Sequence, residues 1–193
     1  VLGYLEGAKR RHVIGSDPFN IEDLWLRMYR NDFWRNGVIA TTVMSAVEVA
    51  CWDIVGKALS QPVYRLLGGQ AHERLKAYAN GWYGGARTPQ EYAQRARDVT
   101  RLGYRALKLD PFGTAWKEMS AEEMDKAEEL VAAVREAVGG EVGLMIEVHG
   151  RLSVGCAIEM GRRLARYDLA WYEEPVTPNS LELLREVKMA LPF

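Results

Sequence analysis

Apolar residues in the second part of the chain follow two alternating patterns. Short apolar runs at 76–80, 105–109, 142–148 and 169–174 predict strands. Each run is followed by a segment with apolar residues three or four positions apart, which predicts a helix. Four such units, each of about 30 residues, predict an α/β fold with a parallel sheet covered by helices. A doubly wound sheet and half of an eight-stranded barrel give the same pattern.

The first 69 residues lack such runs and are predicted to be helical. One helix has apolar residues at 21, 24, 25 and 28, with Asn20 or Asp17 as its cap. A second helix extends from about 41 to 58. Its buried face is expected to contain Val43, Val47, Ala50 and Ile54.

Two helix starts in the second part carry capping boxes. Thr88 and Glu91, with a proline between them, predict the start of one helix, and Ser120 and Glu123 predict the start of another. Both boxes come several residues after a predicted strand, so the loops before them are long enough to carry functional residues.

Composition narrows the classes of partner. The 193 residues include 25 basic and 26 acidic side chains, and this balance gives no electrostatic case for a nucleic acid or an anionic membrane. Cys51 and Cys156 lie in apolar helical patterns and are expected to be buried free thiols. We expect no segment to approach the roughly 20 apolar residues of a membrane span, and we therefore expect a cytoplasmic protein.

Polar side chains gather where three successive predicted strands end. Because catalytic groups in a barrel lie at the carboxyl ends of strands, this placement predicts an active site. In the first two pairs the residues are two positions apart, so both side chains leave the same face of the strand. The three pairs are Lys108 with Asp110, Glu147 with His149, and Glu173 with Glu174.

Each pair alone has an ordinary explanation. A charge at a strand end is usually a cap or a solvated loop residue, and Lys108 with Asp110 is also consistent with an ion pair of small energy. Three neighbouring strands that end alike instead favour a metal-assisted site. Glu147 and Glu173 would supply hard oxygen ligands suited to Mg²⁺. His149 would transfer a proton beside the metal, or serve as a hydrogen-bonding partner in its loop.

Several motifs resemble one enzyme family. "SAVEVACWDIVGKALSQPVYRLLGG", residues 45–69, resembles the signature helix and turn of the mandelate racemase and muconate lactonizing enzyme family, which belongs to the enolase superfamily. "WYEEP" resembles the family's fourth barrel strand, and "ALKLD" lies where its racemases carry Lys-x-Lys. "EVHGR" is similar to the sugar-acid dehydratases of the family, such as galactonate, gluconate and mannonate dehydratase.

The resemblance implies a particular fold. Residues 70–193 would form the first four strand–helix units of a partial (β/α) TIM-type barrel, and residues 1–69 would be the helical remainder of an α+β capping domain. In the family the third metal ligand and the His–Asp base lie on later strands. We therefore expect this chain to be a fragment of a longer enzyme.

The resemblance also implies a reaction. A hydro-lyase of this type dehydrates an aldonate of the gluconate or galactonate type to a 2-keto-3-deoxy acid through an enediolate, with Mg²⁺ as cofactor. Glu147 and Glu173 would bind the metal. Lys108 would stabilise the enediolate oxygens, and His149 would protonate the departing 3-hydroxyl group.

Four further residues are expected to bind the substrate: Asp110, Arg151, Asn80 and Trp82. An ion pair is the alternative for Arg151, and packing is the alternative for Trp82. Two residues depart from the family pattern. Asp110 replaces the second lysine, which disfavours racemisation, and Glu147 replaces the more common aspartate, which adds one methylene at the metal.

Two other functions remain open from the sequence. One is a racemase or epimerase of hydroxy acids in the same superfamily, and the other is a barrel protein without catalysis. His12 and His72 lie outside the strand ends and are assigned to structure. Three tryptophans in the helical part suggest burial against other elements or a second subunit, and so a homo-oligomer: Trp25, Trp34 and Trp52.

Overall fold

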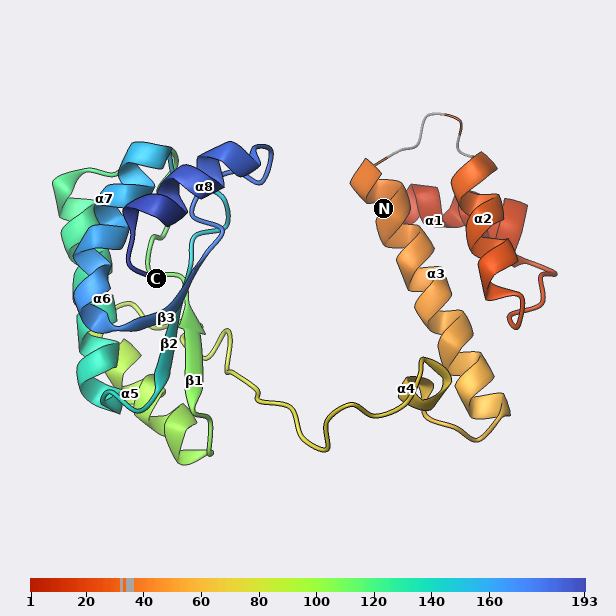
Figure 1. Ribbon diagram of the computed structural model, residues 1–193, viewed down its shortest axis with the longest axis horizontal. Coiled ribbons are helices and arrows are strands. Elements are labelled where there is room, and N and C mark those ends of the chain that lie inside the picture. The colour runs from red at the N-terminus through yellow and green to blue at the C-terminus, as the bar shows by residue number, and fades with distance from the viewer. Residues whose placement is uncertain (32, 34–36) are drawn as a thin grey trace. The chain divides into compact units, whose positions relative to one another are not determined.

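The computed structural model describes residues 1–31, 33 and 37–193, so Trp34 lies outside the described residues. The chain divides into two compact units, Val1–Leu75 and Lys76–Phe193, and Figure 1 labels the elements of each. Cys51 and Cys156 are buried free thiols, as predicted, and burial raises the pKa of both.

The second unit is built on a three-stranded parallel sheet in the order β1-β2-β3. Its strands confirm an α/β fold: β1 (Ala106–Leu109), β2 (Gly143–Glu147) and β3 (Leu169–Glu173). The predicted first strand at 76–80 is wrong, because only Ala79 joins the sheet, through a single bridge to Leu107. Ala79 is also the only buried residue of that segment, so no apolar face holds its neighbours against the sheet.

Four α-helices accompany this sheet, in agreement with the predicted alternation. They are α5 (Pro89–Arg101), α6 (Ala121–Val138), α7 (Val154–Leu164) and α8 (Leu181–Ala190), with a short 3-10 turn η2 (Ala165–Tyr167) after α7. Figure 1 shows α5, α6 and α7 side by side along one face of the sheet. Both predicted capping boxes are present at the starts of α5 and α6.

The two faces of the sheet differ in chemistry. Leu107, Leu109, Leu144 and Ile146 are fully buried and belong to the main hydrophobic core, together with the inner faces of the helices. Residues between them point to the opposite face, because successive side chains of a strand alternate. Because Leu107 and Leu109 pack into the core on one face of the sheet, Lys108 between them points to the other face.

The first unit is helical, as predicted. It contains α1 (Leu2–Ala8), a π-helical turn η1 (Lys9–Val13), α2 (Ile21–Asn31), α3 (Gly37–Ala58) and α4 (Val63–Leu66). The hydrophobic pattern did not predict α1 or η1. A small core joins Ala8 of α1 to residues of α2 and α3: Leu24, Met28, Val43, Met44, Val47 and Cys51.

The predicted buried face of α3 is only partly correct. Val43 and Val47 are buried, but Ala50 and Ile54 are exposed, and Cys51 and Val55 are buried instead. On a buried helix face the next buried residue lies three or four positions further along the chain. After Val47 this allows either Ala50 or Cys51, and the small core that α3 shares with α1 and α2 contains Cys51.

α3 also corrects the expectation about membrane spans. By length and composition alone this helix is long and apolar enough to cross a membrane, so the judgement that no segment approached that length was wrong. One such helix is weak support for a membrane protein, because core helices of soluble proteins pass the same test. Part of α3 faces the small core of its own unit.

The capping boxes provide a direct test of the fold. Replacing Ser120 with Ala removes the side chain that accepts from the backbone N–H of Glu123, and we expect the free energy of unfolding to fall by about 1 kcal/mol. Ser180 is the matched control, because it precedes α8 without a side-chain cap bond. Urea unfolding should show a clear loss for Ser120→Ala and little change for Ser180→Ala; equal losses would contradict this account.

Candidate active site

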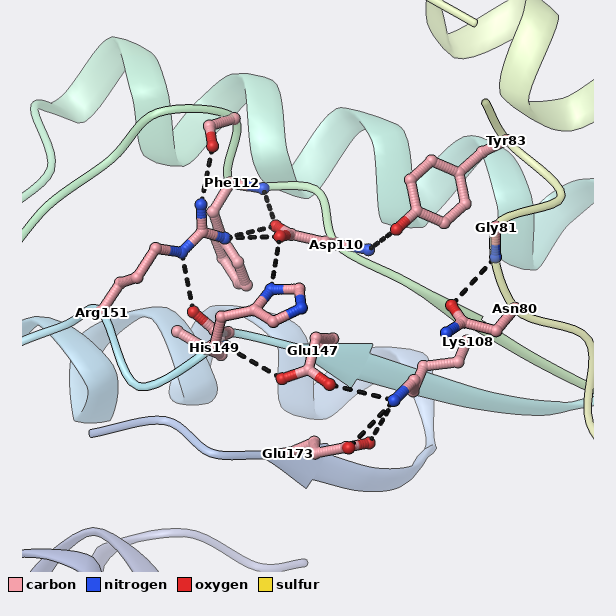
Figure 2. Close-up of polar contacts among 12 residues, drawn as sticks. Asn80, Gly81, Tyr83, Lys108, Asp110, Phe112, Glu147, His149, Arg151 and Glu173 are labelled. Atoms are coloured by element: carbon pink, nitrogen blue, oxygen red, sulfur yellow. Dashed lines mark hydrogen bonds and ion pairs between the residues drawn. The ribbon is translucent and has the colours of Figure 1, made fainter. Parts of the chain in front are cut away.

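The predicted cluster forms at the carboxyl ends of the strands. Glu147 and Glu173 are direct partners in the register of β2 and β3, and Lys108 is one strand away on β1. The Nζ atom of Lys108 lies 3.0 Å from Oε2 of Glu147 and 2.9 Å from both carboxylate oxygens of Glu173. Figure 2 shows this ammonium group between the two carboxylates.

All three side chains lie in a partly desolvated place. The side chains of Lys108 and Glu147 are each 8% exposed, and that of Glu173 is 32% exposed. Burial acts to lower the pKa of Lys108, but its hydrogen bonds to Glu173 and Glu147 outweigh burial and raise the pKa. Burial acts to raise the pKa of Glu147, but the backbone N–H of His149 and the Lys108 ammonium outweigh it and lower the pKa.

His149 belongs to a second cluster beside the first. Its Nδ1 atom lies 2.9 Å from Oδ2 of Asp110, and its backbone N–H donates to Oε1 of Glu147 at 2.9 Å. Arg151 donates from Nη2 to both oxygens of Asp110 at 2.6 Å, so the ion pair considered for Arg151 is present. The structure thus brings Asp110, His149 and Arg151 together (Figure 2).

Asn80 and Trp82 lie at the approach to β1. The indole N–H of Trp82 donates to the backbone carbonyl of Lys108 at 2.9 Å, and its ring packs edge-on against Tyr83. This is the packing arrangement considered for Trp82. The side chain of Asn80 accepts from the backbone N–H of Gly81 at 2.9 Å and is solvent-exposed.

Two aromatic residues of the site were missed by sequence reasoning. The indole N–H of Trp171 donates to Oε2 of Glu173 at 3.0 Å, and its ring meets Tyr78 edge-on. Nζ of Lys108 lies 5.5 Å from the centre of the Tyr78 ring, within the range of a cation–π interaction. The two-residue spacing of Trp171 and Glu173 on one strand was the available signal, since such residues share a face.

The donor set fits a divalent cation in part. Glu147 and Glu173 already converge on one cationic nitrogen, and carboxylate oxygens are the donors that Mg²⁺ prefers. Among the described residues no group of three Asp, Glu, His or Cys side chains is placed to hold a metal ion. The chain therefore offers two carboxylate ligands, and any further ligand would be a water, a substrate oxygen or a group outside the described residues.

A lysine flanked by carboxylates and a histidine, all at the carboxyl ends of parallel strands, is the placement typical of catalytic groups in α/β barrel enzymes. Sequence comparison agrees with this class. Residues 91–193 match the enolase C-terminal domain-like family, and residues 3–68 match the mandelate racemase / muconate lactonizing enzyme N-terminal domain. The chain belongs to the mandelate racemase and muconate lactonizing enzyme family of the enolase superfamily.

Curated relatives include dehydratases. The chain is 42% identical to D-gluconate dehydratase of Thermoproteus tenax over 179 residues, which cover 92% of this chain and 36% of the relative. It is 39% identical to D-gluconate/D-galactonate dehydratase of Picrophilus torridus, over 83% of this chain and 41% of that protein. The chain thus spans less than half the length of these two relatives.

Solved structures show the same fold. A mandelate racemase/muconate lactonizing enzyme from a Sulfitobacter species superposes with a TM-score of 0.88 at 30% identity, over 100% of this chain and 52% of that one. A member of the enolase superfamily from Salmonella Typhimurium gives a TM-score of 0.83 at 32% identity, over 93% of this chain and 51% of that one.

Proposed function

We propose that this chain carries one wall of the active site of a Mg²⁺-dependent aldonate dehydratase, which converts a sugar acid of the gluconate or galactonate type to a 2-keto-3-deoxy acid. The observation that carries the proposal is the convergence of Lys108 on Glu147 and Glu173, with His149 beside them. The names of the relatives from Thermoproteus tenax and Picrophilus torridus support the substrate class.

The proposal includes an architecture. Residues 70–193 would be the first half of a (β/α) TIM-type barrel, and residues 1–69 the helical part of a capping domain. The parallel sheet, with functional side chains at its carboxyl edge, supports the barrel. We also propose a cytoplasmic location and a homo-oligomer, in keeping with a metabolic enzyme.

Glu147 and Glu173 would hold the Mg²⁺ ion. When bound, the ion would supply positive charge to the substrate carboxylate and so favour loss of the neighbouring proton. Sites of the enolase superfamily combine a Lys or His base with magnesium. The longer glutamate at 147 is held in place here by the backbone N–H of His149.

Lys108 would stabilise the charge that develops on the substrate. Removal of the C2 proton, by a base not assigned to this chain, puts negative charge on the carboxylate oxygens as the enediolate forms. The buried ammonium of Lys108 is fixed by two carboxylates and stays protonated well above neutral pH, so it offers a preorganised positive charge.

His149 would act as the general acid. The electron pair of the enediolate forms the C2=C3 double bond while the C3–O bond breaks, and the proton on the imidazole moves to the departing oxygen, which leaves as water. The resulting enol then becomes the 2-keto-3-deoxy acid. Nη2 of Arg151 donates to both oxygens of Asp110, and this pairing disfavours a role for Asp110 as the base that a racemase would need.

An assay with a panel of aldonates tests this function. We expect the full-length protein that carries this sequence to form a 2-keto-3-deoxy acid from D-gluconate or D-galactonate with Mg²⁺, and to lose the activity in EDTA. Restoring Mg²⁺ should restore it. Absence of product from every aldonate tested, at saturating Mg²⁺, would contradict the proposal.

A further inference from the structure

We propose that Asp110 and Arg151 are positioning residues that fix the ring of His149 for proton transfer, rather than contacts for the substrate. This inference rests on the proposed dehydratase function and assigns the supporting groups of its general acid. It replaces the expectation from the sequence that both residues bind the sugar acid.

The carboxylate of Asp110 is already occupied by groups of the protein. Oδ1 accepts from the backbone N–H of Phe112 at 3.0 Å and from Nη2 of Arg151, and Oδ2 faces Arg151 and the ring of His149. Its side chain is only 16% exposed. A substrate hydroxyl group would have to compete with these partners for a largely buried acceptor.

Arg151 is fixed just as fully. Nε donates to the carbonyl of Val148 at 2.8 Å, Nη1 to the carbonyl of Gly113 at 2.7 Å, and Nη2 to Asp110. Its side chain is 17% exposed. The guanidinium therefore ties the loop after β1 to the loop after β2, and its position sets the position of Asp110.

The contact with Asp110 also selects the tautomer of His149. An ionised carboxylate can only accept a hydrogen bond, so Nδ1 of His149 carries the hydrogen. Nε2 is then the atom that holds or releases the transferable proton. In Figure 2 it lies on the side of the ring turned away from Asp110, and the His149 side chain is 59% exposed and open to a ligand.

The backbone of His149 is fixed as well. Its φ of 57° is left-handed, which is uncommon for a residue with a side chain, and Gly150 follows with φ 66°. The N–H of His149 donates to Glu147, and the N–H of Gly150 donates to the carbonyl of Glu174 at 2.7 Å. The backbone at His149 and Gly150 is therefore fixed by these two hydrogen bonds, and the imidazole of His149 is fixed by Asp110.

The first test compares two leaving groups in the full-length protein. Asp110→Asn should lower the dehydration rate constant of the aldonate by about 100-fold, because the acid is no longer held in place. Loss of fluoride from the matching 3-deoxy-3-fluoro aldonate needs no proton on the leaving group, so we expect that rate to fall by less than about 5-fold. Arg151→Gln should show the same selective loss.

Two further variants separate positioning from other roles. Asp110→Asn combined with His149→Asn should be no slower than His149→Asn alone, because Asp110 acts through His149. Asp125→Asn is the matched control, since Asp125 also accepts from an arginine, Arg163, at 2.6 Å but lies on α6. This control should leave both rates unchanged.

Several kinetic results would overturn the inference. A higher KM for the aldonate with an unchanged rate constant in Asp110→Asn would restore the substrate-binding role. Equal losses with both leaving groups would indicate general structural damage, and additive losses in the double variant would show that Asp110 acts independently of His149.

The tautomer of His149 gives a readout that does not depend on activity. In ¹⁵N-histidine spectra of the 193-residue chain at alkaline pH, His149→Asn identifies the signal of His149 among the three histidines. We expect the wild-type ring to be the Nδ1–H tautomer and Asp110→Asn to lose that preference. If the wild type turns over no aldonate, the proposed function fails, but this spectrum still tests whether Asp110 positions His149. A neutral Nε2–H tautomer in the wild type would overturn the positioning role of Asp110.

Discussion

Replacing His149 with Asn in the full-length protein is expected to lower the rate of aldonate dehydration by about 100- to 10,000-fold, the range attributed to general acid catalysis. The 3-hydroxyl group is a poor leaving group without a proton, and the exposed ring of His149 is the proton donor proposed for it. Exchange of the C2 proton with solvent should continue in this variant, because Lys108 remains in place to stabilise the enediolate.

The exchange experiment distinguishes an acid from a base. Product formation and C2 exchange can be followed together by proton NMR in heavy water. His72→Asn is the control, because His72 is exposed in the loop before the second unit and should leave both rates unchanged. Loss of exchange along with dehydration would mean that His149 takes part in proton abstraction, and unchanged dehydration would remove it from the mechanism.

Lys108→Met is expected to destabilise the metal-free chain by about 3 kcal/mol at neutral pH. The substitution keeps most of the side-chain volume but leaves two carboxylates facing each other without their cation, and unpaired buried charges are costly. Urea unfolding measures the effect. Lys57→Met is the control, because Lys57 pairs with Asp53 at 2.6 Å on the exposed surface, where ion pairs contribute little.

The size of this effect should depend on pH in a defined direction. The pKa of Glu147 is lowered in the folded chain, so its pairing stabilises the fold above the ordinary pKa of 4.5 and the stabilisation is lost as pH falls through the folded value. The pKa of Lys108 is raised, so its contribution is complete below 10.5 and is lost as pH rises through the folded value.

The gap in stability between wild type and Lys108→Met should therefore be widest between these limits and close on both sides. A gap that is constant from acid to alkaline pH would show that packing, rather than charge, accounts for the effect. A gap no larger than that of Lys57→Met would contradict the assignment of Lys108 as the central cation of a buried cluster.

Local sequence signals predicted much of the second unit. Ser120 with Glu123 determined the start of α6 because a capping box satisfies two backbone groups within four residues, and it needs no distant partner. The apolar run before Glu147 indicated β2, because a short run of consecutive apolar residues is typical of a buried strand. These features depend on neighbours in the chain.

Features that depend on distant contacts were less predictable. The segment 76–80 resembles a strand, yet only Ala79 finds a buried place beside β1. The burial of Cys51 rather than Ala50 depends on the helices that pack against α3. The charged strand ends suggested which residues would meet, but the direct pairing of Glu147 with Glu173 depends on a strand register that the sequence does not state.

Within the site, too, local spacing was predictable from the sequence and contacts between distant loops were not. Spacing predicted that Lys108 and Asp110 leave the same face of a strand. In the structure Lys108 contacts Glu147 and Glu173, whereas Asp110 lies just after β1. Spacing could not show that Asp110 faces Arg151 and His149, because those contacts join the loops after two different strands. The expectation that Asp110 and Arg151 bind substrate came from the family resemblance, and the contacts described above instead support a positioning role.

Dehydration of an aldonate at this site can be tested by a proton NMR spectrum of the full-length protein incubated in heavy water with Mg²⁺ and D-gluconate or D-galactonate. We expect a 2-keto-3-deoxy acid with one deuterium at C3, because the enol formed by loss of water takes up a deuteron from the solvent. Recovery of the aldonate with its C2 proton replaced but its 3-hydroxyl group intact would instead indicate racemase-type chemistry. Recovery of both aldonates unchanged would contradict the claim that Lys108, Glu147, His149 and Glu173 form a dehydration site.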